Sequence, residues 1–507
     1  MSFAARSGVD SPERQAACAR LLKLVDTSGV DQIRLSWCDL HGQLRGKTLT
    51  RLALTQALNN GIGMVSTILL KDTSDRTAYK VFEAGGVADL PGSESGFAAA
   101  SNLVLLPDPA SYRQPPWAAR TGWLQCQAWF PSGEPVALDT RHVLQQALDR
   151  LKQAGFGMRC GLEVEFHIYK INEAGLAHAL NPYQAAWPGP APDVQMIHPG
   201  YNLLGEAWGD QCALPLRIVQ DTAQALGLPL TSLEVELGPS QVEAVFDVTD
   251  ALTAADTMVL FRSSTVQALR RAGYHATFMC RPPFPNIMSS GWHLHQSLVQ
   301  SDNSHQSLAQ PADGHNAFAR VLPRAGCDAQ DAEFTLSATG SHYLAGLLAH
   351  APAMAALATP TINGFERFRP NALAPQAIIW GRDNRGAMLR VVGGAGDTAT
   401  HIENRLGEPA ANPYLYIASQ IHAGLDGITR QMVAPRASLV PYDPAHPQLP
   451  TRLATALDFL QQDATYTAGL GSGFVDYFCR IKHAELERHA QSDDQAEWAR
   501  REYFGRI

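Results

Sequence analysis

Hydrophobic positions along the 507-residue chain recur at two spacings, and these predict helices alternating with strands. Residues 11–30 and 141–154 have the spacing of amphipathic helices, and the second is closed by Gly155. Residues 33–50 alternate around a central His-Gly dipeptide, as in a β-hairpin. Between residues 218 and 282 a helical segment twice precedes a strand. We therefore expect helices to cover one face of a sheet.

Proline and polar residues divide this pattern. The stretch 81–120 is rich in loop-forming residues, which predicts one domain at residues 1–120 and a second at 121–507. The second would begin with a strand at 123–130. Residues 298–318 are polar and are expected to form a loop. The most apolar run, 343–358, is too short for a membrane span and contains His350 and Pro352, which favours a buried helix.

Three short polar clusters interrupt the apolar pattern between residues 160 and 298: GLEVEF, ELGPSQVE and GWHLH. In the first and third, polar residues two apart on a strand project from one face. One Glu-x-Glu alone is more often a solvated strand edge. Several clustered carboxylates repel one another unless a divalent cation is bound, and oxygen ligands favour Mg²⁺ or Mn²⁺. The candidate metal ligands are Glu163, Glu165, Glu236, Glu243, His293 and Glu403.

Arginines gather after this set, at positions 367, 369, 382, 385, 390 and 405. Their planar guanidinium groups bind carboxylates and phosphates, although each could instead form a surface ion pair. The chain has no P-loop and no G-x-G-x-x-G motif. Metals and arginines together therefore indicate a nucleotide site. His295, in the same strand as His293, could be structural or could contact a ligand.

The composition of the chain limits which kinds of partner it could bind. The net charge is −8, 17% of residues are charged, and no Lys/Arg block occurs, which argues against nucleic acid or an anionic membrane and favours small substrates. The eight cysteines are far apart and form no C-x-x-C motif. The first 15 residues lack the apolar core of a signal peptide. We expect a cytoplasmic protein.

Taken in order, these motifs resemble the glutamine synthetase family over nearly the whole chain: GLEVEF, E-x-G-P-x-Q-x-E, G-x-H-x-H-x-S, N-G-F-E-R-F-R-P, N-R-x-A-x-x-R, IE-x-R and NPYL. The resemblance implies an α+β protein. It would have an N-terminal β-grasp domain and a C-terminal catalytic α/β domain with a curved antiparallel sheet. It also implies a homo-oligomeric ring, commonly a dodecamer, with active sites between neighbouring subunits.

The resemblance also implies roles for individual residues. The ligands of a metal facing glutamate would be Glu165, Glu236 and Glu243. The ligands of a metal bridging the ATP phosphates would be Glu163, His293 and Glu403. Arg367 would hold the carboxylate of glutamate, Arg385 and Arg390 would stabilise the transferring phosphoryl group and nucleotide, and Arg405 would lie near the acyl phosphate. His295 and Ser297 would contact the nucleotide. The implied reaction is phosphorylation of the γ-carboxylate by ATP, followed by attack of an amine.

Departures from the family pattern concern the amine. Leu373 stands where ammonia-using members carry a glutamate, and GIGMVSTILL at 61–70 replaces a segment with an ammonium-binding Asp. Met288 and Ser289 replace Asn and Gly, with Trp292 following. His401 replaces a nucleotide-binding arginine.

An apolar pocket stabilises a cation poorly, so we expect a γ-glutamylamide-forming ligase that uses a hydrophobic or aromatic monoamine, such as an arylamine that is neutral at pH 7. A carboxylate from another loop, such as Glu366 or Asp383, would undo this argument. Alternatives are ordinary glutamine synthesis from ammonia, a catalytically silent structural relative, and phosphorylation of a guanidino compound.

Overall fold

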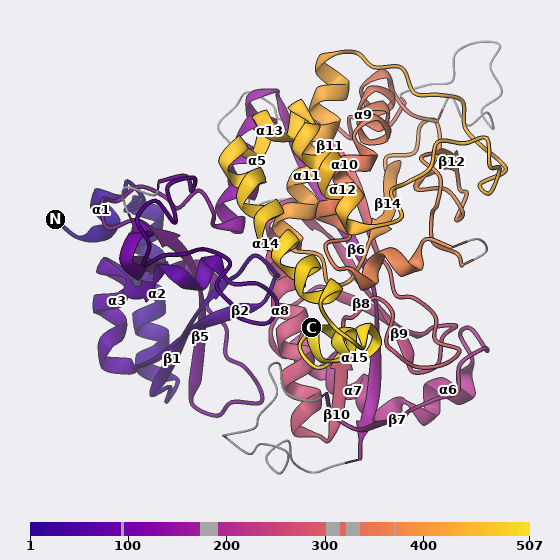
Figure 1. Ribbon diagram of the computed structural model, residues 1–507. Helices are drawn as coiled ribbons and strands as arrows, with labels where there is room; N and C mark the ends of the chain where they lie inside the picture. Colours follow the sequence, from indigo (N-terminus) through magenta and orange to yellow (C-terminus); the bar gives the residue numbers. More distant parts are fainter. Residues whose placement is uncertain (93–95, 173–190, 301–314, 321–334, 370–371) are drawn as a thin grey trace.

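Two sheets and the helices around them make up the computed structural model of the protein (Figure 1). The structure describes residues 1–92, 96–172, 191–300, 315–320, 335–369 and 372–507. Most of the predicted polar loop at 298–318, and residues 370–371, lie outside this part. The α+β architecture expected from the sequence is confirmed.

The N-terminal sheet has five strands in the order β2-β1-β5-β4-β3. Its strands are β1 (Gln32–Cys38), β2 (Leu44–Thr50), β3 (Ile62–Val65), β4 (Asn102–Pro107) and β5 (Thr121–Trp129). The central pair β1/β5 is parallel and the other pairs are antiparallel. The predicted hairpin β1-β2 is confirmed, and Gly42 in its turn has a φ of 73° that favours glycine. Its helices are α1 (Phe3–Arg6), α2 (Pro12–Thr27) and α3 (Leu54–Asn60).

Strand β5 corrects one expectation from the sequence. It was assigned to the second domain, but it lies in the middle of the first sheet, where Gln32 pairs with Thr121 and Val104 with Trp129. A domain boundary at residue 120 would remove this central strand from its sheet. Strand pairing is a long-range property, about which the loop composition at 81–120 carries no information.

The second sheet has nine strands, with β12-β13-β14-β11-β6-β9-β8 in order and β7 and β10 paired with β6. Its strands are β6 (Phe156–Ile171), β7 (Val194–Met196), β8 (Leu230–Val235), β9 (Gln241–Asp250), β10 (Tyr274–Thr277), β11 (Trp292–Gln300), β12 (Trp380–Arg382), β13 (Leu389–Val392) and β14 (His401–Gly407). All pairs are antiparallel except β12/β13, which is parallel. The expected antiparallel sheet therefore carries a parallel edge.

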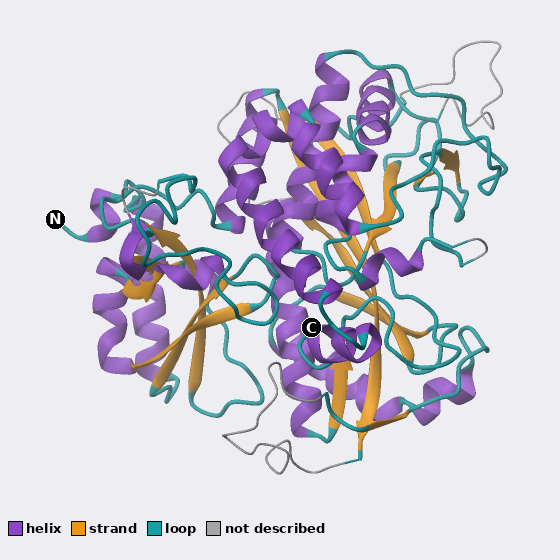
Figure 2. Ribbon diagram, viewed as in Figure 1, coloured by secondary structure: helices purple, strands orange, loops and turns teal. Residues whose placement is uncertain are grey.

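Helices pack against this sheet (Figure 2). They are α5 (Thr140–Gln153), α6 (Glu206–Gln211), α7 (Ala213–Ala225), α8 (Ala251–Arg271), α9 (Ala338–Ala349), α10 (Ala351–Ala358), α11 (Pro413–Thr429), α12 (Leu453–Gln462), α13 (Ala464–Leu470), α14 (Ser472–Ala490) and α15 (Gln495–Ala499). Short helical turns occur at η1 (Arg51–Ala53), η2 (Ser66–Leu70), η3 (Ala98–Ala100), η4 (Pro109–Ser111), η7 (Asn363–Arg367) and η8 (Arg500–Phe504). The apolar run 343–358 is buried as predicted, but it forms two helices that meet at His350. Within the described residues, no helix is long and apolar enough to cross a membrane.

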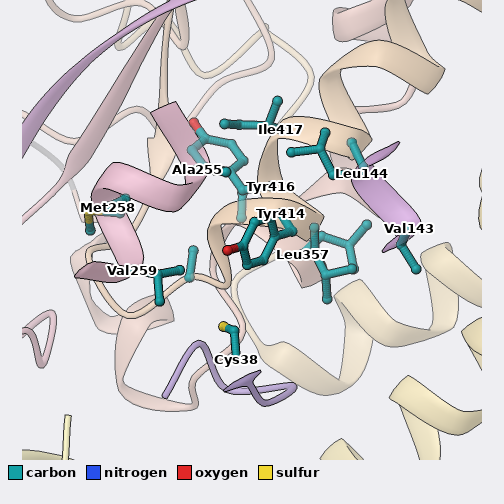
Figure 3. Close-up of a cluster of buried hydrophobic side chains, with 14 of the residues drawn as sticks. Cys38, Val143, Leu144, Ala255, Met258, Val259, Leu357, Tyr414, Tyr416 and Ile417 are labelled. Carbon is teal, nitrogen blue, oxygen red and sulfur yellow. The ribbon is translucent and has the colours of Figure 1, made fainter. Parts of the chain in front are cut away.

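Helix α11 lies at the centre of the core, in contact with α5, α8, α9 and α10. Figure 3 shows Tyr414 of α11 near Val259 of α8 and Leu357 of α10, with Cys38 of the N-terminal hairpin beside them. One continuous apolar core thus joins the two sheets. This core supports the strands that carry the polar clusters.

Candidate active site

The polar clusters meet on one face of the second sheet. Register places His293 of β11 opposite Glu163 of β6, and Glu165 opposite Glu243 of β9. The intervening residues Leu162, Val164 and Phe166 are buried on the other face, as the alternation predicted. The polar face lines a cavity of about 510 Å³. The candidate residues in this lining are Glu163, Glu165, Glu236, Glu243, His293, Arg367, Arg385, Arg390 and Arg405.

One group of possible metal ligands is Glu163, His293 and Glu403. The Nδ1 atom of His293 lies 3.2 Å from an oxygen of Glu163 and 3.5 Å from an oxygen of Glu403. Strand pairing brings the three together, although Glu403 is 110 positions after His293 in the chain. Glu403 is fully buried and also accepts hydrogen bonds from Arg390 and Arg405 at 2.8 and 2.5 Å.

A second group is Glu165, Glu243 and His293, whose Nε2 atom is 3.7 Å from Glu165. The other Glu165 oxygen accepts hydrogen bonds from the backbone N–H of Gly291 at 2.9 Å and from the Gln241 amide at 3.0 Å. These two donors hold one oxygen and leave the other directed to the imidazole. His293 therefore stands between the two groups.

The carboxylates of the second group are electrostatically strained. Burial, and then the charge of Glu236, raise the pKa of Glu165 to about 7. Burial, and then Glu165, raise the pKa of Glu243 to about 10, and burial also raises the pKa of Glu236. Bound cations relieve such repulsion, and carboxylate oxygens with one imidazole suit a hard divalent metal. The residues present thus fit the divalent metal that the sequence analysis expected.

In the first group, made of Glu163, His293 and Glu403, the pKa of the carboxylate at Glu163 is lowered instead of raised. Burial alone would raise the pKa of Glu163, but its contacts with His293 and His295 hold that pKa below its usual value. Burial, and then Arg405, lower the pKa of His293 to about 4, so its imidazole is neutral at pH 7. A neutral imidazole has a free lone pair, which metal coordination requires. This group therefore also has the ionisation state of a metal site.

Glu234 is an acidic residue that the sequence analysis overlooked. It lines the cavity from β8, pairs in register with Glu243, and accepts a hydrogen bond from Ser232 at 2.9 Å. The alternation Glu234-Val235-Glu236 repeats the pattern of Glu163 and Glu165, so the same reasoning could have found it. The cavity is more acidic than predicted.

Arg367 is almost fully buried at the cavity wall, in the helical turn η7. Its Nη1 donates to the carbonyls of Leu406 and Gly407 at 2.7 and 2.8 Å, and its Nη2 donates to the carbonyl of Arg405 at 3.2 Å. The Nε–H has no partner among the described residues. Nε and the second Nη2 hydrogen form one edge of the guanidinium, which matches the two oxygens of a carboxylate.

The other arginines differ in their contacts. Arg390 is held between Asp383, at 2.5 Å, and Glu403, at 2.8 Å. Arg405 pairs with Glu403, and its buried Nε has no partner in the described residues. Arg385 is exposed at the cavity. Positive charge thus lies next to Glu403.

Two predicted nucleotide contacts lie outside the cavity lining. The Nε2 atom of His295 is 3.0 Å from Glu163, and its Nδ1 is 2.9 Å from His401. Ser297 lies further along β11, opposite Arg159. Trp292, noted beside His293 in the sequence, is fully buried against Tyr416 and takes no part in the cavity.

The lining also contains apolar side chains, which are Leu203, Leu204, Leu237, Val245, Met288, Ala372, Leu373 and Ala374. Leu373 is 59% exposed and has a left-handed φ of 59°. The leucines at 203 and 204 come from a loop with no sequence signal of function. The cavity therefore has an acidic and basic region and an apolar region.

Comparisons with known proteins agree with this architecture. A family model described as "Glutamine synthetase, catalytic domain" matches residues 137–501. A γ-glutamylanilide synthase from Acinetobacter sp. is 36% identical over 99% of this chain and 99% of that protein. A γ-glutamylethanolamide synthetase from Streptomyces coelicolor is 27% identical over 96% of this chain and 95% of that protein. A solved GmaS/ADP complex superimposes with a TM-score of 0.71 at 26% identity, covering 95% and 98% of the two chains.

The chain belongs to the glutamine synthetase family. Its fold and its full-length similarity to glutamate–amine ligases define it as an ATP-dependent enzyme that forms γ-glutamyl amides. The family implies ATP and a divalent metal, and the Glu/His groups described above are where such a metal could be held.

Proposed function

We propose that this ligase joins glutamate to a hydrophobic amine, with an arylamine such as aniline as the favoured substrate. The observation that carries the proposal is that Leu373 lines the cavity. The family resemblance puts this residue where ammonia-using members would carry a glutamate. An arylamine is uncharged at pH 7 and needs no carboxylate to remove a proton before attack. The 36% identity to a γ-glutamylanilide synthase supports the same substrate class.

The two carboxylates named from the sequence as possible replacements are engaged elsewhere. Asp383 is paired with Arg390 at 2.5 Å and its side chain is 67% exposed. Glu366 lies 3.5 Å from Arg369 on the exposed side of η7. Neither belongs to the cavity lining. The apolar end of the cavity thus offers contacts for a ring or alkyl group rather than for an ammonium ion.

Two divalent cations, Mg²⁺ or Mn²⁺, would neutralise negative charge on the carboxylate and the phosphates. We propose Glu165, Glu236 and Glu243 as ligands on the glutamate side, and Glu163, His293 and Glu403 as ligands on the nucleotide side. Gln241 and the backbone of Gly291 would hold Glu165 in place through the hydrogen bonds given above. His295 and Ser297 are proposed nucleotide contacts.

The arginines would act on the reacting groups. Arg367 would bind the carboxylate of glutamate through its Nε–H, which has no partner among the described residues, and through the Nη2 hydrogen that does not donate to Arg405. In the first step an oxygen of the γ-carboxylate attacks the γ-phosphorus of ATP and ADP leaves, with Arg385 and Arg390 stabilising the charge that develops. In the second step the amine nitrogen attacks the γ-carbonyl carbon, phosphate leaves, and the nitrogen loses a proton. Arg405 would stabilise the departing phosphate.

Product analysis tests this proposal. Purified protein is incubated with ATP, glutamate, Mg²⁺ or Mn²⁺ and one amine at a time: aniline, isopropylamine, ethanolamine, putrescine or ammonium. Phosphate release is measured, and products are identified by mass spectrometry. We expect γ-glutamylanilide to form with the highest kcat/KM. Glutamine formed from ammonium as the main product would contradict the proposal and indicate an ordinary glutamine synthetase.

Leu373→Glu provides a sharper test of the amine preference. A carboxylate at this exposed position would stabilise an ammonium ion. It would also remove the apolar contact between the leucine side chain and the ring of an arylamine. We expect kcat/KM for ammonium to rise and that for aniline to fall, each by about tenfold, which corresponds to about 1.4 kcal/mol. Leu373→Met, which keeps volume and polarity, is the matched control. An unchanged ratio of the two kcat/KM values would show that residue 373 does not select the amine.

We also propose that the protein assembles as a homo-oligomeric ring, most simply a dodecamer of 54.9-kDa chains, in a reducing cytoplasm. Ring assembly is supported by family membership. The compartment is supported by the cysteines of the described part of the chain, all of which are free. Mass photometry of the purified protein would test the assembly, and a monomeric mass would contradict it.

A further inference from the structure

The loop from Gly200 to Gly205 presents two leucines to the cavity. Leu203 is 52% exposed and Leu204 is 61% exposed, and both belong to the lining that contains Glu236 and Leu373. Large apolar side chains exposed next to a site are apolar surface that a ligand can cover. The fold imposes this exposure, because the backbone of the loop is fixed.

Backbone conformation shows that the loop is held in place. Tyr201 and Leu204 have φ values of 57°, which non-glycine residues rarely adopt, and Gly200 has 73°. A Cβ at Gly200 would lie 2.5 Å from the backbone nitrogen of Pro239, so the loop is in close contact with the turn before β9. Such strain persists where the surrounding structure determines the conformation.

Hydrogen bonds anchor the loop on both sides of Glu236. The N–H of Tyr201 donates to the carbonyl of Leu237 at 2.7 Å, and the N–H of Leu204 donates to the carbonyl of Val235 at 3.1 Å. The Tyr201 hydroxyl donates to the carbonyl of Asn286 at 2.6 Å, in the segment that carries Met288. The backbone of Leu203 and Leu204 is therefore held beside Glu236.

We propose that Leu203 and Leu204 form a second apolar wall of the amine site, and that this wall determines how large an amine the enzyme accepts. The inference rests on the proposed function, because it assigns the wall to the apolar part of the amine. Its location follows from the anchoring: Glu236 is a proposed ligand on the glutamate side, and the amine must approach the γ-carbonyl there. Leu373 comes from a separate segment, 169 positions after Leu204 in the chain, so the two walls can be varied independently.

Steady-state kinetics with Leu203→Ala, Leu204→Ala and the double variant test the wall. We expect the KM for aniline to rise by about fivefold to twentyfold in the double variant, since part of two leucine contacts is lost. The KM values for glutamate and ATP should stay within about twofold. Arylamines with longer para-alkyl groups, or naphthylamine, should gain relative to aniline. Leu214→Ala, an equally exposed leucine outside the cavity, is the matched control.

A reciprocal variant keeps the test independent of lost stability. Leu203→Phe fills space, so it should reduce kcat/KM for naphthylamine more than for aniline. Equal effects on all amines, or equal effects on the three substrates, would overturn the inference while leaving arylamide formation by the wild type intact. A change of particle mass without a change in amine preference would show that the leucines contact a second copy of the chain, and would also overturn it. A wild type that accepts only ammonium would reject the proposed function together with the inference.

Discussion

At the scale of single residues, the ionisation of the cavity carboxylates is the strongest indication of its chemistry. Glu165, Glu236 and Glu243 all have a raised pKa because they are buried and lie close to other glutamates of the cavity. Such a cluster is unfavourable unless protons or cations are bound to it. We therefore expect the protein with bound metal to be more stable than the metal-free protein.

Glu243→Gln tests the ligand assignment. Because its pKa is raised to about 10, the Glu243 carboxyl of the metal-free folded protein is protonated at pH 7, and taking up this proton on folding costs stability. The amide is neutral in the folded and unfolded states, so we expect the metal-free variant to unfold at a higher temperature than the wild type. The same change removes an anionic ligand, so the Mg²⁺ or Mn²⁺ concentration needed for half-maximal stabilisation should rise by at least about tenfold, or about 1.4 kcal/mol. Thermal unfolding with chelator and with graded metal measures both. Glu206→Gln, an exposed glutamate on α6, is the control and should change neither value.

Arg367→Lys tests the proposed carboxylate contact. Lysine keeps the charge but loses the planar edge formed by Nε and Nη2. We expect kcat/KM for glutamate to fall by about tenfold to a hundredfold, which corresponds to about 1.4 to 2.7 kcal/mol for a charged hydrogen-bond pair. The KM for ATP should change little. Arg369→Lys, a half-exposed neighbour paired with Glu366, is the control, and an equal loss there would argue against a specific role for Arg367.

At the scale of elements, His350 joins helices that are distant in sequence. It lies between α9 and α10, with its Nδ1 atom 2.6 Å from Asp463 before α13 and its Nε2 atom 2.9 Å from Asp426 on α11. Burial opposes protonation, but these two carboxylates raise the pKa of His350 above its usual value. The apolar run predicted as one helix is therefore divided at a charged junction.

We expect His350→Gln to destabilise the protein by about 1 to 3 kcal/mol, because two charge-assisted hydrogen bonds are lost. Since the pKa is raised in the folded state, this stabilisation is fully present below pH 6.5 and is lost as pH rises through the folded pKa. Urea unfolding at pH 6 and at pH 9 measures it, and the difference between wild type and variant should shrink at the higher pH. His315→Gln, at an exposed position, serves as the control. A pH-independent difference would contradict the protonated junction.

At the scale of the whole molecule, metal binding should govern the pH dependence of stability. The pKa of Glu165 is raised to about 7 in the folded protein. A raised carboxyl pKa gives stability that is present below the unfolded pKa, near 4.3, and is lost as pH rises through about 7. We therefore expect metal-free protein to lose about 1 to 3 kcal/mol between pH 5 and pH 8.

Saturating Mg²⁺ or Mn²⁺ should reduce this loss or remove it, since the cation stabilises the ionised carboxylates. Unfolding curves at matched ionic strength, with chelator or with metal, provide the measurement. Glu165→Gln should make the metal-free profile less steep, and the slope that remains is expected from Glu243, whose pKa is also raised. A metal-free wild type whose stability is constant from pH 5 to pH 8 would show that Glu165 ionises normally in the folded protein.

Several features were determined by the sequence alone. The alternation in GLEVEF predicted which face of β6 is buried, because side chains on a strand must alternate whatever the fold around them. The hairpin at residues 33–50 and the helix at 141–154 were predicted from local turn and capping residues. The ordered motifs also identified the family. These features depend on residues that are close together in the sequence, so local patterns are sufficient to predict them.

Only the tertiary structure decided how distant segments combine. It placed β5 in the first sheet, brought Glu403 next to His293, and left Nε of Arg367 without a partner among the residues that the structure describes. It also placed Leu203 and Leu204 in the same cavity as Leu373. The physical reason is the same in each case: pairing between strands and packing between loops depend on residues far apart in sequence, about which local periodicity carries no information.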